Sequence, residues 1–355
     1  MKNCTLTGRS RYATVFLQTI AGRARHSPVG RLPEVGKNVS TLADQSSEHR
    51  LGWLGTGRMG IALIHRLLDA GCDVTVYNRT KAKAEPLAQA GAKVVDTAAD
   101  LATVDILFVT VGTSQDLIDA VIGPKGVTSG GRAPSIVVDC STVSANDSER
   151  VGRELAAVGS SLLAAPVMGN PKVASVGRLT FAVSGPAAAF ATVQPYLAIL
   201  GAGATYVGEG ELARAVKLCH NLFLGVVIQS LAEVTVLAEK SGISRQALLA
   251  CLNNSVMGST FSRYKTPALV NLDFHPTFTT VLLRKDFDLG LAAAREHEVP
   301  MPVASTVYQL LQSLVGHGFG EEDFAALLVQ QARSAGLELT SENAEVSDGL
   351  TLATD

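Results

Sequence analysis

The sequence predicts a doubly wound α/β domain that a long helix joins to an all-helical C-terminal domain. Between residues 50 and 208, short runs rich in Val, Ile and Leu alternate with stretches of helical periodicity. Such near-continuous apolar strands are typical of a parallel sheet with helices on both faces. After residue 210 the strand pattern stops, and helical periodicity continues without a break through residue 242.

The elements of the first domain follow in order. We expect strands at residues 50–55, 73–78, 93–96, 105–111, 135–140, 161–167, 178–184 and 204–208. Helices are expected at residues 58–71, 81–91, 114–123 and 146–159, with Pro86 awkwardly placed in the second. In the second domain, helices are expected at residues 211–242, 244–254, 282–297, 303–318 and 321–336. The two domains therefore span residues 51–210 and 211–336.

The two flanking segments differ from these domains in composition. Residues 1–27 contain Lys and Arg but no Asp or Glu, and residues 1–50 as a whole fit an organelle transit peptide. Import into mitochondria or plastids is then expected, whereas a disordered extension or a misjudged start site would leave the protein cytoplasmic. Residues 337–355 are acidic and polar, and are predicted to be disordered.

Composition argues against several classes of protein. The net charge of −2 gives no basic surplus for a nucleic-acid partner. The five cysteines are scattered, without a CxxC pair or a Cys/His cluster, so no metal site and no disulfide framework is expected. The longest apolar run, residues 222–238, contains Gln229, Ser230 and Glu233. It is therefore predicted to be a buried helix and not a membrane span.

A glycine-rich turn joins the first strand to the first helix. Its glycines have the spacing G-x-G-x-x-G within a βαβ unit. There the first glycine permits a tight turn, the second lets the backbone approach a pyrophosphate, and the third lets the helix pack close to the strand. The helix start also attracts phosphate. We predict a Rossmann-type dinucleotide site here, with a plain tight turn as the alternative. The residues assigned to the cofactor are Gly55, Thr56, Gly57, Arg58, Met59 and Gly60.

The end of the second strand indicates which dinucleotide binds. An NAD site usually has Asp or Glu there, about 20 residues after the glycines, to hold the ribose hydroxyls. This strand instead ends in Asn78, Arg79 and Thr80. Arg79 can pair with a 2′-phosphate, and its two neighbours can hydrogen-bond it without repulsion. The sequence therefore favours NADP over NAD, unless Arg79 is only a solvated surface residue.

Several segments within residues 51–337 resemble the β-hydroxyacid dehydrogenase family, which includes 3-hydroxyisobutyrate dehydrogenase and glyoxylate/succinic semialdehyde reductases. GTGRMG resembles the cofactor fingerprint, and DCSTVSA at residues 139–145 resembles the D-x-S-T-x-x-P segment. AAPVMGNP at residues 164–171 resembles D-A-P-V-S-G-G. KLCHN at residues 217–221 resembles the catalytic K-x-x-x-N, and RKDFDLGLA at residues 284–292 resembles the K-D-L-x-L-A helix.

The resemblance implies roles for particular residues. Lys217 would be the catalytic residue and Asn221 its companion, while Thr142 and Lys285 would contact the nicotinamide half of the cofactor. The positions implied to contact the substrate are Ser141, Met168, Gly169 and Asn170. The resemblance also implies a homodimer or homotetramer acting on a small carbonyl or hydroxy acid.

The residues around Lys217 support its role without the resemblance. Lys217 and Asn221 lie four apart on a helical pattern and share one face among apolar neighbours. A lysine there is costly unless it has partners. In the cleft at the strand ends it could give a proton to a carbonyl oxygen and stabilise the alkoxide. A lysine that snorkels to solvent is the alternative. His220 is expected to pack against the helix surroundings.

The chain departs from the family pattern where the substrate carboxylate would bind. Met168 replaces the usual Ser, Asn170 replaces the second Gly, and Pro171 removes an amide donor. Ala145 replaces the proline of the D-x-S-T segment. The sequence therefore predicts the type of reaction and leaves room for a carbonyl with a different or bulkier substituent.

The predicted function is an NADPH-preferring oxidoreductase that interconverts a small aldehyde or keto acid and its hydroxy acid. An imine reductase-like enzyme is one alternative, although that group usually has another residue at the position of Lys217. A non-catalytic dinucleotide-binding scaffold is the other, but it would not need Lys217, Asn221 and Lys285 together.

Overall fold

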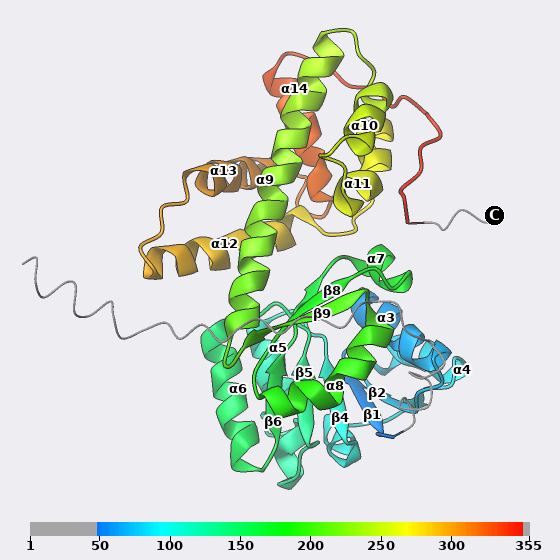
Figure 1. Ribbon diagram of the computed structural model, residues 1–355, viewed down its shortest axis with the longest axis vertical. Coiled ribbons are helices and arrows are strands. Elements are labelled where there is room, and N and C mark those ends of the chain that lie inside the picture. Colours follow the sequence, from blue (N-terminus) through cyan, green and yellow to red (C-terminus); the bar gives the residue numbers. More distant parts are fainter. Residues whose placement is uncertain (1–47, 351–355) are drawn as a thin grey trace, which may run out of the picture. The chain divides into compact units, whose positions relative to one another are not determined.

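The computed structural model of the chain describes residues 48–350 (Figure 1). The predicted transit peptide or extension therefore lies outside the described residues up to residue 47, as does the end of the predicted C-terminal tail. Strands and their flanking helices make up residues 51–208, and the elements from residue 212 onward are all helical. The predicted class, a doubly wound domain followed by a long helix and a helical domain, is confirmed.

The sheet of the first domain contains nine strands within the described residues. They are β1 (Leu51–Leu54), β2 (Val74–Tyr77), β3 (Lys93–Val94), β4 (Ile106–Val109), β5 (Ile136–Asp139), β6 (Ser161–Ala164), β7 (Val167–Met168), β8 (Thr180–Ser184) and β9 (Gly203–Gly208). Neighbours run in the order β3-β2-β1-β4-β5-β6-β8-β7, and β9 pairs with β8. The order reverses between β1 and β4, which is where a doubly wound sheet binds its ligand.

The strands from β3 to β6 run parallel, as the sequence predicted, and antiparallel pairs occur only where β8 meets β6 and β7 within the described residues. β8 runs antiparallel to both β6 and β7, and parallel to β9. The chain returns from β7 to β8 through residues 169–179, which contain only the short helix α7 (Pro171–Ser175). A parallel connection needs a crossover of a dozen or more residues. This short return therefore makes β8 antiparallel.

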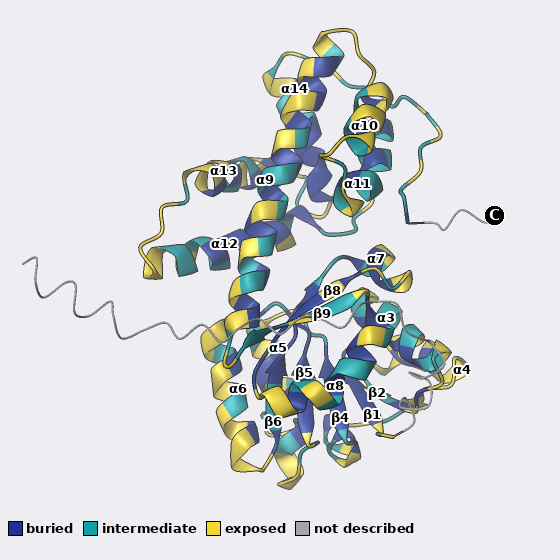
Figure 2. Cartoon of the chain, viewed as in Figure 1, coloured by how far each residue is buried: buried dark blue, intermediate teal, exposed yellow. Residues whose placement is uncertain are grey.

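Helices cover both faces of the sheet. The helices and 3₁₀ turns of this domain are α3 (Arg58–Asp69), η1 (Lys81–Lys83), α4 (Glu85–Gln89), η2 (Ala98–Thr103), α5 (Ser114–Val121), η3 (Val127–Gly130), α6 (Ala145–Ala157), α7 and α8 (Ala187–Leu200). Residues of α3 and α8 share one apolar cluster with the sheet, and those of α5 and α6 share another. The central strands between them are buried, as Figure 2 shows. Strands β1, β4 and β5 are buried throughout, as their apolar sequences predicted.

The second domain is built around one long helix. Its elements are α9 (Leu212–Lys240), α10 (Arg245–Asn254), α11 (Thr260–Asn271), α12 (Thr280–Glu296), α13 (Pro302–Gly316), η4 (Phe324–Ala326) and α14 (Leu327–Ser334). Helix α9 packs against α10, α12, α13 and α14. Within the described residues, α9 is long and apolar enough to cross a membrane, but half of its most apolar window is buried inside the protein. It thus serves as the core helix of this domain.

The described part of the predicted disordered tail lies against the folded domains. Residues 337–350 form no helix or strand, but Glu342 accepts a hydrogen bond from the backbone N–H of Arg245 at 2.7 Å. Arg178 donates to the carbonyl of Gly349 at 2.6 Å. Polar composition predicted disorder here because it offers little to bury, but Leu350 is buried in a core cluster, and hydrogen bonds to backbone groups add to this contact.

Candidate active site

The three glycines of the turn after β1 serve two different purposes. Gly55 has a φ of +98°, and a Cβ there would lie 2.0 Å from the carbonyl oxygen of Thr110. A Cβ on Gly60 would lie 2.1 Å from the carbonyl oxygen of Gly55. The fold itself therefore requires these two glycines. A Cβ on Gly57 would meet nothing within 4 Å. The protein itself therefore does not require glycine at this position, and the open space could hold a ligand.

The start of α3 is prepared for an anion. The helix has no acidic residue in its first turn, and Gly57 provides no side-chain cap. Its first N–H groups are therefore left for a ligand, and the helix dipole favours negative charge there. Thr110, at the end of β4, braces the turn by donating to the Gly55 carbonyl at 2.8 Å and accepting from Trp53 Nε1 at 2.9 Å. These features fit the pyrophosphate of a dinucleotide.

A pocket of about 450 Å³ lies at the end of β2. The predicted cofactor residues Gly55, Asn78, Arg79 and Thr80 line it. Asn78 holds the turn, because its Oδ1 accepts from the backbone N–H of Thr56 at 2.9 Å. Arg79 is exposed and pairs with Asp116 at 3.2 Å. Lys83 and Lys125 add two more cations to the lining of this pocket.

A second cavity, of about 500 Å³, lies between residues of the two domains. The sequence-assigned residues that line it are Gly57, Arg58, Met59, Gly60, Ser141, Thr142, Met168, Gly169, Asn170, Lys217 and Asn221. Thr56 is buried in the turn, and Lys285 reaches the same region by donating to the carbonyl of Thr142 at 3.2 Å. The structure thus brings together assigned residues as far apart in the sequence as Gly57 and Asn221.

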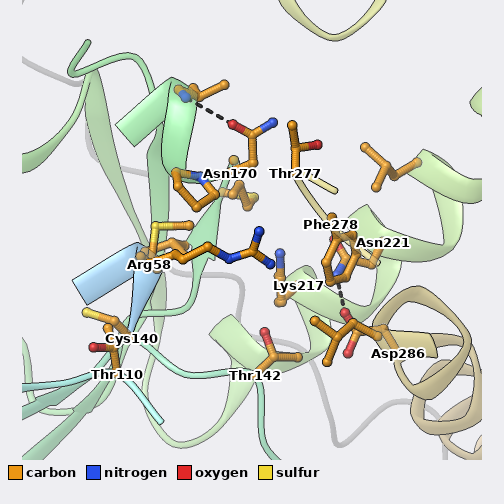
Figure 3. A pocket seen from close by; sticks show the side chains of 18 of the residues that line it. Arg58, Thr110, Cys140, Thr142, Asn170, Lys217, Asn221, Thr277, Phe278 and Asp286 are labelled. Carbon is orange, nitrogen blue, oxygen red and sulfur yellow. Dashed lines mark hydrogen bonds between the residues drawn. The ribbon is translucent and has the colours of Figure 1, made fainter. Parts of the chain in front are cut away.

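Lys217 is the central charged group of this cavity. It lies on α9, is only 7% exposed, and directs its amino group into the cavity (Figure 3). Burial lowers the pKa of Lys217 to about 8; Asp286 opposes this shift and Lys285 adds to it. The amine can therefore exchange a proton near neutral pH, which suits a general acid or base.

A hydrogen-bonded set surrounds Lys217. Asn221, one turn further along α9, donates to Asp286 on α12. His220 Nδ1 contacts Asn221 Oδ1 at 2.9 Å, and His220 lines the cavity. This corrects the expectation that His220 only packs against its surroundings. Because the amide oxygen can only accept, Nδ1 of His220 carries the proton in this contact.

A buried arginine fixes the turn after β5 against the start of α9. Arg214 donates to Asp139 at 2.7 Å and to the carbonyl of Ser141 at 3.1 Å. Asp139 also accepts from the N–H of Ser141 at 3.0 Å, and Ser141 Oγ accepts from the N–H of Val111 at 2.9 Å. The Ser141–Thr142 turn and the helix that carries Lys217 are thereby held as one unit.

The far end of the cavity is formed by the altered segment and an aromatic wall. Gly169 has a φ of +152°, and Asn170 Oδ1 caps α7 by accepting from the N–H of Val173 at 3.0 Å. Asn170 is 5% exposed, and its Nδ2 forms no hydrogen bond of normal geometry within the described residues. Tyr264 is its polar neighbour. The aromatic residues of the wall are Phe261, Tyr264, Phe278 and Phe324.

Sequence reasoning missed several residues of the site. Asp286 follows Lys285 directly in the segment already assigned, so that adjacency was a usable signal. Thr110 lies near the end of the strand predicted at residues 105–111, which pairs with β1, and this was a weaker signal. Arg214 and Phe324 reach the site only through tertiary packing, and no local pattern marks them. No group of His, Cys, Asp or Glu within residues 48–350 could hold a metal ion.

Both domains match models of known protein families. Residues 50–208 match the model described as the NAD binding domain of 6-phosphogluconate dehydrogenase. Residues 211–330 match that described as the NAD-binding domain of NADP-dependent 3-hydroxyisobutyrate dehydrogenase. The chain is 30% identical to the chloroplastic glyoxylate/succinic semialdehyde reductase 2 of Arabidopsis thaliana over 80% of each protein.

Solved structures show the same relationship. A 3-hydroxyisobutyrate dehydrogenase from Salmonella typhimurium matches with a TM-score of 0.72 and 25% identity, covering 80% of this chain and all of that one. An imine reductase from Myxococcus stipitatus matches with a TM-score of 0.52 and 27% identity, covering 79% of this chain and 99% of that one. With the dinucleotide turn, the buried lysine and both family models in place, the chain belongs to the β-hydroxyacid dehydrogenase family of NAD(P)-dependent oxidoreductases that act on CH–OH groups.

Proposed function

We propose that this protein reduces a small aldehyde or keto acid to its hydroxy acid with NADPH, and that Lys217 is the proton donor. The observation that carries the proposal is a buried lysine with a pKa of about 8 in a cavity that adjoins a dinucleotide turn. When bound, the cofactor supplies hydride to the carbonyl carbon. Lys217, as the ammonium, gives its proton to the carbonyl oxygen and stabilises the charge that develops there.

The residues around Lys217 support this role. Asn221 and Asp286 form a hydrogen-bonded pair beside the Lys217 amine, and the negative charge of Asp286 favours the charged form of Lys217. In the reverse direction the free amine takes the hydroxyl proton. Ser141 and Thr142 lie on the turn to which Arg214 is hydrogen-bonded. Lys285 donates a hydrogen bond to the Thr142 carbonyl of the same turn. Thr142 and Lys285 are the residues we assign to the nicotinamide half of the cofactor.

The pocket at the end of β2 supports NADP over NAD. Arg79, Lys83 and Lys125 give three cations there, and Arg79 already pairs with a carboxylate that a 2′-phosphate could replace. We expect Arg79→Ala to weaken NADPH binding roughly tenfold or more with little effect on NADH. Asp116 and Asp119 are the carboxylates in this lining, and Asp116 is the one that pairs with Arg79, so Asp116→Asn should tighten NADPH binding. Titrating both cofactors into each variant measures this, and equal losses for both cofactors would contradict it.

The far end of the cavity supports a substrate that carries an acid group and an apolar substituent. Lys217 and Arg58 line the cavity, while its lining has a single carboxylate, Asp286, which is already paired. The Asn170 amide nitrogen makes no hydrogen bond of normal geometry within the described residues, although Tyr264 lies beside it, and Met168 with the aromatic wall provides apolar surface. We infer that Asn170 takes over part of the acid-binding role of the family's missing serine.

A substrate screen tests the function and separates it from both alternatives. The purified protein is mixed with NADPH or NADH and a panel of aldehydes, keto acids and cyclic imines, and absorbance at 340 nm is followed. Reduction of aldehydes or keto acids supports the proposal. Preference for cyclic imines would identify an imine reductase, although the solved imine reductase matches less well in TM-score than the 3-hydroxyisobutyrate dehydrogenase. Cofactor binding without turnover of any carbonyl or imine would leave the scaffold alternative.

Two further expectations belong to the same proposal. We propose a homodimer or homotetramer, supported by exposed apolar side chains on α9. We also propose that the basic segment at residues 1–27 directs import into mitochondria or plastids. Fusion of residues 1–50 to a fluorescent reporter tests the second expectation, and a diffuse, unprocessed cytoplasmic signal would contradict it.

A further inference from the structure

Arg58 links the dinucleotide turn to the helical domain. It is the first residue of α3, directly after Gly57, and its side chain extends into the main cavity (Figure 3). Its guanidinium donates to the carbonyl of Pro276 at 2.7 Å. No carboxylate within residues 48–350 pairs with it. A guanidinium has five N–H donors in a planar fork, so donors remain for a second acceptor.

The loop that contains the Pro276 carbonyl is part of a buried hydrogen-bond network. Thr277, the next residue, donates its backbone N–H and its hydroxyl to Asp323 Oδ2 at 3.0 and 2.7 Å. Lys265 donates to Asp323 Oδ1 at 2.6 Å and to Thr277 Oγ1 at 3.0 Å. Lys265 and Asp323 are each 1% exposed. A buried pair of this kind is costly to break, so residues 276–278 are held in one position against it.

The same network forms one wall of the substrate end of the cavity. Phe324 follows Asp323, and its N–H donates to the carbonyl of Phe278 at 3.3 Å. The Lys265 ammonium lies 4.2 Å from the centre of the Phe324 ring. Thr277, Phe278 and Phe324 all line the cavity. A continuous series of contacts therefore runs from the phosphate-binding turn, through Arg58, to the wall that a substrate would touch.

We infer that Arg58 couples the two ligands: its guanidinium contacts the cofactor phosphate and the Pro276 carbonyl together, so that cofactor binding fixes the substrate wall. This inference rests on the proposed function, because it requires the dinucleotide at the turn. The open space over Gly57 and the uncapped start of α3 would hold the phosphate, and Arg58 is the residue that directly follows Gly57. Arg58 is thus a positioning residue for the substrate as well as a cofactor contact.

The physical basis is a shared orientation of one side chain. Without cofactor, a single neutral acceptor, the Pro276 carbonyl, holds the exposed guanidinium, so we expect the hydrogen bond between Arg58 and Pro276 to break often. A phosphate adds charge-assisted hydrogen bonds that fix the fork in the orientation that also serves Pro276. Ligands coupled in this way change each other's affinity reciprocally, typically by 5- to 150-fold. The coupling should disappear when the fork is removed, even if the cofactor still binds.

Hydrogen exchange with NADP⁺ as the only added ligand tests this without any substrate. We expect saturating NADP⁺ to slow exchange at residues 277–279 and 323–326 by about fivefold or more in the wild type. In Arg58→Met, residues 55–61 should still be protected by NADP⁺, but the two wall segments should exchange as in the free protein. Arg58→Lys keeps the charge and loses the fork, so it should retain cofactor affinity and lose most of the wall protection.

Arg66→Met is the matched control. Arg66 lies on the same helix and donates to a backbone carbonyl, that of Ile199, but not at the cavity. This variant should keep the wall protection of the wild type. Wall protection in Arg58→Met equal to that of the wild type, with NADP⁺ bound, would overturn the coupling and leave the proposed function standing. Absence of protection at residues 55–61 in the wild type would overturn both.

Discussion

At the residue scale, Lys217 shows how a site can oppose stability. Its pKa falls from 10.5 to about 8, mainly because burial disfavours the ammonium. The unfolded chain therefore binds more protons at this group than the folded one between pH 8 and 10.5. Stability from this group is lowest below pH 8 and rises as pH increases through that window. The sequence revealed the lysine and its helical partner, but not the burial that tunes it.

This gives a stability prediction. Lys217→Met removes a buried charge and keeps most of the side-chain volume, so we expect the free energy of unfolding at pH 7 to rise by about 3 kcal/mol. At pH 10.5 the difference from the wild type should be much smaller. Urea unfolding at both pH values measures it. A variant less stable than the wild type at pH 7 would show that partners fully compensate the buried ammonium.

Asn170 has two roles that can be separated by substitution. Its oxygen caps α7, and its amide nitrogen is the group we assign to the substrate acid. Asn170→Asp and Asn170→Ser both keep a capping oxygen, so each should change the free energy of unfolding by less than about 0.5 kcal/mol. Asn170→Ala removes the cap and should lower the free energy of unfolding by about 1 kcal/mol. With a keto acid identified by the screen, Asn170→Asp should raise KM most, through repulsion.

The uncharged ester of the same keto acid is the control. Its KM should change little in Asn170→Asp, because the new carboxylate has no charge to repel. An unchanged KM for the acid in this variant would limit Asn170 to its capping role. Substitution of Met168 for the family's serine was visible in the sequence, but the orientation of the Asn170 amide depends on the cap and could not be inferred from spacing.

At the scale of elements, sequence patterns correctly predicted those strands and helices in which one face or both faces are clearly apolar. The buried strands β1, β4 and β5 and the long helix α9 were predicted for this reason. Helices α8 and α11 were missed, and each contains an internal proline, Pro195 and Pro267. Proline removes a helical hydrogen bond, so the local sequence predicts no helix at these positions. Tertiary packing nevertheless maintains both helices here.

The contact between α9 and α12 gives an element-scale prediction. Gly225 on α9 faces α12, and a Cβ there would lie 2.5 Å from the Phe287 ring. Phe287 is fully buried and adjoins Asp286. Gly225→Ala should therefore lower the free energy of unfolding by about 1–3 kcal/mol, despite the better helix propensity of Ala. It should also reduce kcat, by moving Asp286 away from Asn221.

Gly316→Ala on α13 is the comparison for Gly225→Ala. A Cβ at Gly316 meets nothing within 4 Å, so the propensity gain of roughly 0.5–1 kcal/mol should appear as higher stability with normal kcat. Thermal unfolding and steady-state kinetics of the two variants measure both effects. Similar stability for both variants would mean that α12 shifts to admit the methyl group.

At the scale of the whole molecule, the site depends on contacts between segments far apart in sequence. Lys285 binds the Thr142 carbonyl, Arg58 binds that of Pro276, and Asn221 binds Asp286. Motif order along the chain predicted that both domains contribute to the cavity. It could not predict these pairings, because a hydrogen bond between segments far apart in the sequence depends on how they pack and leaves no periodic signal in either segment.

Assembly is the second property at this scale. Leu212, Phe223 and Val234 on α9 are exposed and recur every 11 residues, or three helical turns, so they lie along one stripe. Phe223 and Leu237 are each 68% exposed. Burying such a stripe in a partner would stabilise a dimer. We expect Phe223→Glu to lower the oligomeric state in sedimentation velocity at micromolar concentration.

Val303→Glu is the control for the assembly prediction. Val303 is 59% exposed at the start of α13, so it is not part of the α9 stripe, and it undergoes the same chemical change. It should leave the sedimentation coefficient unchanged. A wild type that sediments as a monomer, or identical behaviour of Phe223→Glu and the wild type, would contradict a role for this stripe.

The pH dependence of carbonyl reduction, measured for the wild type and Lys217→Met, tests the central claim most directly. In the wild type, reduction should be fastest below the Lys217 pKa of about 8 and should fall as the pH rises through it, because the ammonium is the proton donor. The reverse oxidation should rise over the same range. Lys217→Met should lower kcat for reduction by about 10²-fold or more and lose this pH dependence, while NADPH binds normally. Lys240→Met, at the far end of α9, should behave as the wild type. Wild-type kcat in Lys217→Met, or an unchanged pH profile, would contradict the assignment of Lys217 as the proton donor.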